Sequence, residues 1–84
     1  MDKKEKYINF IVDDLVTKTE INYEQGRINF PFSHIPSHPF YSLSILFILS
    51  PFSKYIKERY GTRDEEINII WRQYKERIQS LIKK

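Results

Sequence analysis

The 84-residue sequence contains no cysteine, no alanine and only two glycines. Without cysteine it has no disulfide, no thiolate metal site and no cysteine nucleophile, and nothing in it indicates an oxidising compartment. Two glycines are too few for the glycine-rich loops that hold nucleotide cofactors. Isoleucine, lysine, asparagine, tyrosine and phenylalanine are common instead, which indicates AT-rich coding, as in a low-GC genome, a phage or an organelle. We therefore expect a cytoplasmic protein without a nucleotide cofactor.

Long apolar runs are also missing. The longest, Phe40 to Leu49, has ten residues and includes two serines, whereas a helix needs about 20 residues to span a bilayer. The N-terminal stretch is interrupted by Asn9, Asp13 and Asp14, which the core of a signal peptide would not contain. We expect no membrane partner and no secretory signal.

Length and charge bound the chain further. It has room for one small globular domain, residues 1–84, because a chain of this size buries only about 60 to 65% of its unfolded surface. The formal net charge is +3. Residues 1–66 carry 9 basic and 10 acidic side chains, and residues 67–84 carry 5 basic and 1 acidic. The positive excess therefore lies in the C-terminal segment.

The N-terminal segment has the pattern of an amphipathic helix. Asp2 and Glu5 have the spacing of a capping box, which satisfies free N–H groups at a helix start. Apolar residues then recur at helical spacing, namely Ile8, Ile11, Val12, Leu15 and Val16. The sequence predicts a helix from Lys3 to Lys18.

The next segment predicts a β-hairpin from about Glu20 to Phe30. With Gln25-Gly26 as a two-residue turn, residues of the same kind face each other across the strands. The predicted pairs are Glu24 with Arg27, Tyr23 with Ile28, Asn22 with Asn29, and Ile21 with Phe30. This register places Ile21, Tyr23, Ile28 and Phe30 on the buried face and directs the two asparagines and the Glu–Arg pair toward water.

The middle of the chain is less regular. Prolines predict an irregular connection from Ser33 to Pro39. Phe40 to Leu49 alternates as a strand would, yet it is apolar enough for a buried helix, which we favour. Ser50-Pro51 is a typical helix start, and we expect a further helix through Tyr60 that ends at Gly61.

The last segment has the strongest helical pattern. Thr62, Asp64 and Glu65 predict a second capping box. The apolar stripe that follows consists of Ile67, Ile70, Trp71, Tyr74, Ile78, Leu81 and Ile82. Such a helix is about 30 Å long, roughly the diameter of a small domain. We therefore expect the distal residues Ile78, Leu81 and Ile82 to need a partner, which predicts self-association.

These elements predict a helix-dominant α+β fold. Its parts are an N-terminal helix, a β-hairpin, two short helices and a long C-terminal helix. The alternative takes Phe40 to Leu49 as a strand, which gives a three-stranded antiparallel sheet with two flanking helices. In either case the apolar face of the hairpin must pack on helices, because an isolated hairpin is only marginally stable.

The two histidines do not form a convincing metal site. His34 and His38 are four residues apart, the spacing of two ligands on one helical face. Pro36 lies between them and disrupts a helix, and no cysteine supplements them. We expect two loop histidines, one of them docked on the core, and no metal site.

Catalytic constellations are equally weak. Asp13 and Asp14 are adjacent on a helix, so their side chains point about 100 degrees apart, and Asp14 is better spaced to pair with Lys18. Ser33 or Ser37 could join a histidine and an aspartate only if a strained turn and an oxyanion hole were also present. We expect no catalytic residue, no cofactor and no small-molecule substrate.

Basic residues in the C-terminal half form a candidate surface for nucleic acid. Phosphate contacts would come from lysine and arginine, and exposed tyrosines such as Tyr55 or Tyr60 would stack on bases. Direct reading of the major groove is disfavoured, because the final helix starts with acids, Asp64, Glu65 and Glu66, which phosphates repel. The candidate residues are Lys54, Lys57, Arg59, Arg72, Lys75, Arg77, Lys83 and Lys84.

Two function classes follow. The leading hypothesis is a non-enzymatic interaction or regulatory protein that works through a protein partner or a homodimer. The second is a nucleic-acid-binding module that uses the basic C-terminal surface.

Overall fold

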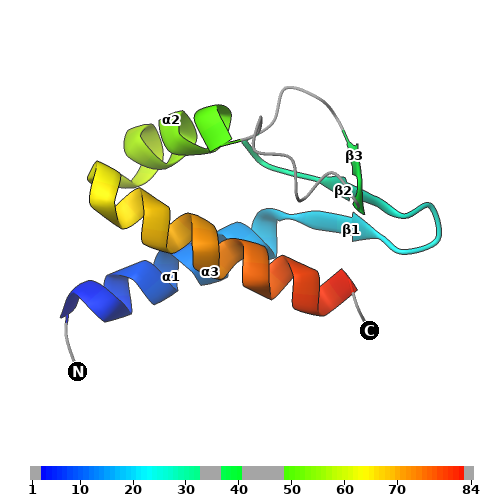
Figure 1. Cartoon of the computed structure of the whole chain (residues 1–84), viewed down its shortest axis with the longest axis horizontal. Coiled ribbons are helices and arrows are strands. Elements are labelled where there is room, and N and C mark those ends of the chain that lie inside the picture. Colours follow the sequence, from blue (N-terminus) through cyan, green and yellow to red (C-terminus); the bar gives the residue numbers. More distant parts are fainter. Residues whose placement is uncertain (1–2, 33–36, 41–48, 83–84) are drawn as a thin grey trace.

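The protein is described by a computed structural model, which places residues 3–32, 37–40 and 49–82. The helices and strands of Figure 1 confirm a helix-dominant α+β fold. In chain order they are α1 (Lys3–Lys18), β1 (Glu20–Asn22), β2 (Arg27–Asn29), β3 (His38–Pro39), α2 (Leu49–Tyr60) and α3 (Asp64–Ile82). Most of the ambiguous run Phe40 to Leu49, with the first predicted short helix, lies outside the described residues.

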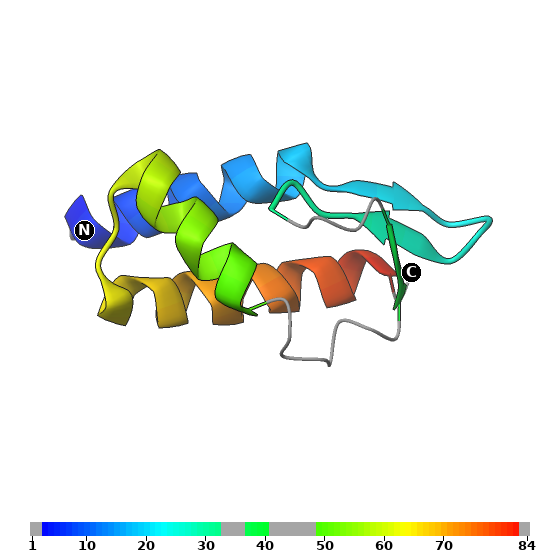
Figure 2. The same ribbon diagram turned by 90° about the horizontal axis from the view of Figure 1, so that it is seen from above.

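The elements form two layers. α1 and α3 lie side by side along the long axis and run in the same direction (Figures 1 and 2). α2 crosses above both of them in Figure 2, and the sheet lies beside it, over the C-terminal ends of α1 and α3. The three-stranded antiparallel sheet has the order β1-β2-β3.

The first helix matches its predicted bounds, and its stripe forms one wall of the core. Ile8, Ile11, Val12 and Leu15 are at most 5% exposed. The predicted helix through Tyr60 is α2, which begins at Leu49, and its chain leaves the helix at Gly61 with a φ of +67°. The position just after a helix often has a left-handed backbone conformation, and glycine is the residue usually found there.

The capping box of α3 lies one residue later than predicted. The N–H of Arg63 donates to the carboxylate of Glu66 at 3.0 Å, and the N–H of Ile67 donates to the Arg63 carbonyl. Thr62 was the expected cap, but its side chain is turned into the protein, 7% exposed, and its hydroxyl has no hydrogen-bond partner among the described residues. Arg63 and Glu66 therefore occupy the cap and third helical positions.

The hairpin forms, but its predicted register is wrong. Ile21 pairs with Ile28, and Asn22 pairs with Arg27, so four residues connect the strands. A two-residue Gln25-Gly26 turn of the favoured kind would need positive φ at both residues. Among the described residues only glycines have positive φ, Gly26 at +64° and Gly61. The four-residue loop does not require a positive φ at Gln25. The Asn22 side chain also accepts a hydrogen bond from the Gln25 N–H at 3.1 Å.

The register shift keeps most of the predicted faces. Ile28 and Phe30 are buried and Ile21 is half-buried against the core, as predicted. Tyr23 was expected on the buried face, but it lies in the loop and is 55% exposed. The predicted pair of Glu24 with Arg27 is not formed across the strands, because Asn22 takes the place opposite Arg27.

A third strand lies within the predicted irregular connection. His38 pairs with Ile28, and Pro39 pairs with Arg27. The N–H of Phe40 donates to the Gly26 carbonyl at 3.0 Å. Arg27 and Pro39 are therefore a non-hydrogen-bonded pair of the antiparallel ladder. Pro39 can therefore end the strand, because its missing N–H would point away from β2.

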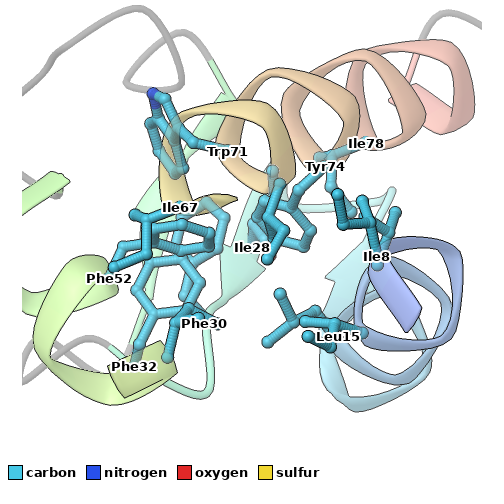
Figure 3. Packing of buried hydrophobic residues seen from close by; sticks show 14 residues of the cluster. Ile8, Leu15, Ile28, Phe30, Phe32, Phe52, Ile67, Trp71, Tyr74 and Ile78 are labelled. Atoms are coloured by element: carbon cyan, nitrogen blue, oxygen red, sulfur yellow. The ribbon is translucent and has the colours of Figure 1, made fainter. Parts of the chain in front are cut away.

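Aromatic side chains fill the space between the layers (Figure 3). Tyr74 of α3 is fully buried, with its ring centroid 5.8 Å from that of Phe32 and 5.9 Å from that of Phe52. Its hydroxyl lies 2.6 Å from the hydroxyl of Thr19, which donates to the Leu15 carbonyl at 2.7 Å. Tyr74 thus joins α2, α3 and the end of α1, as its predicted core position requires.

The loop geometry predicts the effect of Gln25→Gly. Gln25 has no positive φ, so glycine at this position relieves no backbone strain in the folded protein. Glycine does increase the conformational freedom of the unfolded chain, which should lower the free energy of unfolding by about 0.5–1 kcal/mol. Urea denaturation followed by Trp71 fluorescence measures this. Gly26→Ala is the reference: its Cβ meets nothing within 4 Å, so any loss reports the +64° backbone alone. A more stable Gln25→Gly variant would indicate the two-residue turn instead.

Candidate functional site

The described histidine belongs to the core. His38 is 3% exposed, and its ring centroid lies 5.3 Å from that of Phe30. Burial lowers the pKa of this imidazole below its ordinary value. His34 lies outside the described residues. Among the residues that the structure places, no three histidine, aspartate or glutamate side chains gather into a potential metal site.

The adjacent aspartates of α1 serve two different contacts. Asp14 pairs with Lys18 at 2.8 Å, as predicted, and also accepts from the Tyr60 hydroxyl. These hydrogen bonds, that of Lys18 first, lower the pKa of Asp14. Asp13 instead pairs with Arg77 of α3 at 2.9 Å. The two carboxylates therefore face different partners and do not converge on one site.

Two of the candidate basic residues are engaged in ion pairs. Lys57 pairs with Asp64 at 2.6 Å, and Arg77 pairs with Asp13. Lys83 and Lys84 lie outside the described residues. The acids of α2 and α3 are interspersed with the bases, since residues 49–82 contain seven basic and five acidic side chains. Such a mixture weakens the electrostatic footprint expected for nucleic acid.

The aromatic partners of these cations are already engaged. The Arg59 guanidinium lies 5.8 Å from the centre of the Tyr55 ring, and the Lys75 ammonium lies 5.4 Å from that of Trp71. Tyr55 is half-buried, and Tyr60 uses its hydroxyl on Asp14. Burial is the main reason that the pKa of Tyr60 is raised. Neither tyrosine is the exposed stacking platform that we expected. Lys54 and Arg72 are exposed and have no partner in the described part of the chain.

The distal end of α3 is covered by its own chain. Ile78 is fully buried, and Leu81 and Ile82 are partly buried against the same core. Tyr23 of the hairpin loop donates to the Leu81 carbonyl at 3.2 Å, which satisfies one of the free carbonyls at a helix end. Ile78 is therefore not free to contact a second copy, and the reason for predicting self-association through it is gone.

An open hollow of about 550 Å³ lies on the hairpin. Its wall is the solvent-facing row of the sheet, in which Glu20 pairs with Asn29 and Asn22 pairs with Arg27. Arg27 donates to the Ser37 hydroxyl at 3.4 Å. The full lining is Glu20, Ile21, Asn22, Tyr23, Glu24, Gln25, Arg27, Asn29 and Ser37.

One backbone position beside this hollow lacks a strand partner in the described part of the chain. Successive residues of a strand direct their N–H and C=O groups to opposite sides. Ile28 uses its groups toward β3, so Arg27 and Asn29 use theirs toward β1. It follows that the N–H and C=O of Ile21 point to the free edge of the sheet, because β1 is an outer strand. The hollow thus combines polar side chains with an open backbone donor and acceptor.

No family model, curated protein or solved structure matches the chain. In the part of the chain that the structure describes, no helix is both long and apolar enough to cross a bilayer. The arguments for function therefore rest on the geometry of the molecule.

The hollow was missed by the sequence reasoning. The alternation of polar and apolar residues did place Asn22 and Asn29 in water, and both are exposed. The strand from His38 to Pro39 was the missing part, because it brings Ser37 beside Arg27. Proline at position 39 argued against a paired strand there, because proline has no N–H to donate to a strand ladder.

Burial of His38 predicts that the protein loses stability on mild acidification. The folded pKa lies below the unfolded value of 6.5, so unfolding takes up a proton as the pH falls below about 6.5. The free energy of unfolding should fall from about pH 7 to about pH 5, by at most about 1.4 kcal/mol per pH unit for one proton.

Urea denaturation at several pH values measures this slope. A His34→Gln background leaves His38 as the single histidine, and His38→Gln added to it should reduce the slope. Asp14 contributes little in this interval, because its ordinary pKa is 3.8 and its pKa in the folded protein is lower still, so both lie below pH 5. An unchanged slope after His38→Gln would contradict the assignment.

Proposed function

We propose that the protein is a small non-enzymatic binding protein of the cytoplasm that engages a polypeptide partner at its hairpin. The observation that supports this proposal is the hollow on the hairpin, whose lining includes all three residues of the outer strand β1. Exposed strand edges are the ready-made site for an added strand from another chain. Polar side chains beside the edge supply hydrogen-bonding groups, as the rim of an interface does.

The shape of the site favours a polypeptide over a small metabolite. Small-molecule sites enclose most of their ligand and are mainly apolar, whereas this hollow is open and lined chiefly by charged and amide side chains. The other exposed large apolar side chains among the described residues are Tyr7 and Phe10 of α1, with Phe10 at 61% exposure, and Ile69 of α3.

Filling the hollow tests this proposal. Random peptides displayed on phage and selected on the immobilised protein should enrich a shared motif. Asn29→Tyr places a bulky side chain on the exposed sheet face and should weaken binding of the synthetic peptide by about tenfold, about 1.4 kcal/mol. Asn68→Tyr, on the exposed side of α3, is the matched control and should bind as the wild type does.

Two outcomes would overturn the proposal: no motif is enriched, or Asn29→Tyr binds the peptide as tightly as the control. Light scattering on the same samples addresses self-association. A dimer that Asn29→Tyr converts to a monomer would identify a second copy of the chain as the partner.

The second candidate function is nucleic-acid binding. Two observations favour it: Lys54 and Arg72 are exposed cations without partners among the described residues, and residues 67–84 of the sequence carry 5 basic side chains and 1 acidic side chain. Charge reversal of Arg77 is unsuitable as a test, because this side chain binds Asp13 of α1. Lys54 and Arg72 can be changed without breaking an interaction in the structure.

If this function holds, the double variant Lys54→Glu/Arg72→Glu should bind labelled single-stranded RNA more weakly than the wild type. Anisotropy titrations at several salt concentrations should show a salt slope reduced by about one to two, because each lost phosphate contact lowers it by about 0.7–0.9. Lys3→Glu/Lys6→Glu, on the exposed side of α1, changes the net charge by the same amount and is the control. Equal slopes in all three proteins would exclude this surface.

A further inference from the structure

The geometry points to an extended peptide segment bearing lysine or arginine as the occupant of the hollow, added as a fourth strand beside β1. This inference rests on the proposed function and specifies the partner's chemistry. Its three elements are the open backbone of Ile21, the two carboxylates of the lining and the half-buried side chain of Ile21 on the other face.

The backbone of β1 fixes where the partner can pair. Ile21 is the strand residue that directs both N–H and C=O to the free edge, since Glu20 and Asn22 direct theirs to β2. Next to it, the N–H of Thr19 already donates to the Val16 carbonyl. One partner residue can therefore exchange two hydrogen bonds with Ile21, and its neighbours come to lie beside Glu20 and Asn22.

The charges of the hollow favour a cation on that segment. Its lining contains two carboxylates, Glu20 and Glu24, and one guanidinium, Arg27. The observed register leaves Glu20 opposite Asn29 and Arg27 opposite Asn22, so neither acid has a cation directly across the strands. No described cation forms an ion pair with either acid. A lysine or arginine beside Glu20 would supply the opposite charge that favours a cross-strand pair.

The other face of β1 selects an apolar residue. Ile21 is half-buried and packs against the core. Because side chains alternate across a strand, the residue paired with Ile21 places its side chain next to that isoleucine, while its neighbours face the hollow. In an antiparallel arrangement the partner then has a polar residue, an apolar residue and a basic residue in succession from N- to C-terminus.

Titration with model peptides tests the inference. The probe is a short peptide that alternates lysine and valine, added to ¹⁵N-labelled protein, and binding is followed by shifts of the backbone amide signals. We expect the Ile21 amide and its neighbours around the hollow to shift. Glu20→Gln should weaken binding by about two- to fivefold, as loss of an exposed ion pair does. Glu65→Gln, an exposed acid on α3, should leave binding unchanged.

Two comparison peptides separate charge from strand pairing. A peptide that alternates glutamate and valine should not bind, because it repeats the charge of the hollow. A lysine–valine peptide methylated at its valine nitrogens should also fail, since it lacks the N–H groups for the carbonyl of Ile21. If both bind as well as the parent peptide, the strand-addition inference is wrong.

The outcomes also separate this inference from the proposed function. Failure of the lysine–valine peptide, together with binding of a phage-selected peptide at the hollow, would overturn the basic segment and leave the proposed function standing. Failure of every peptide at the hollow would overturn both. If the Ile21 amide signal shifts with protein concentration in the absence of peptide, the partner at β1 is a second copy of the chain, and the peptide inference is wrong.

Discussion

The fold depends on one buried side chain, Tyr74. Its ring contacts Phe30 of the hairpin, Phe32 after it and Phe52 of α2. Its hydroxyl meets Thr19, so the polar end of the ring is satisfied where α1 passes into β1. Burying a hydroxyl without a partner would cost about 1–3 kcal/mol. Aromatic pairs each contribute about 0.5–1.5 kcal/mol beyond the area they bury. The two layers thus meet at one residue of α3 that contacts the hairpin, the segment after it, α2 and the junction of α1 with β1.

The sequence predicted those features that local periodicity controls. The bounds of α1 and the buried stripe of α3 follow from apolar residues at helical spacing, and the structure has both. The hairpin was also predicted, yet its register was not, because side-chain matching favoured a turn that Gln25 cannot adopt without positive φ. Backbone strain at one residue outweighed four plausible side-chain pairs. The register moved by an even number of positions, which preserved the buried face.

The remaining errors concern contacts between distant segments. Ile78 looked uncovered because a helix of its length exceeds a typical small core, but the hairpin reaches its end through Tyr23 and Leu81. Thr62 looked like a helix cap until packing turned it inward. Two of the basic residues predicted to bind nucleic acid, Arg77 and Lys57, form ion pairs with aspartates of other segments. Local patterns do not reveal which partner a long side chain finds.

The same register explains why the hairpin is both protected and open. Natural proteins limit the hazard of an exposed strand edge by keeping the strand short and charged, and β1 has only three residues with Glu20 at its start. Ile21 alone offers its backbone, so indiscriminate pairing with long strands gains little there. Specific pairing needs side-chain contacts as well, and these come from the polar row that β2 presents beside it. Such an edge favours a partner that is recognised by its basic charge and its alternating polar and apolar side chains. It disfavours a partner that is held mainly by a long ladder of backbone hydrogen bonds. Affinity at such a site would be modest and sensitive to salt, because its ionic contacts are exposed.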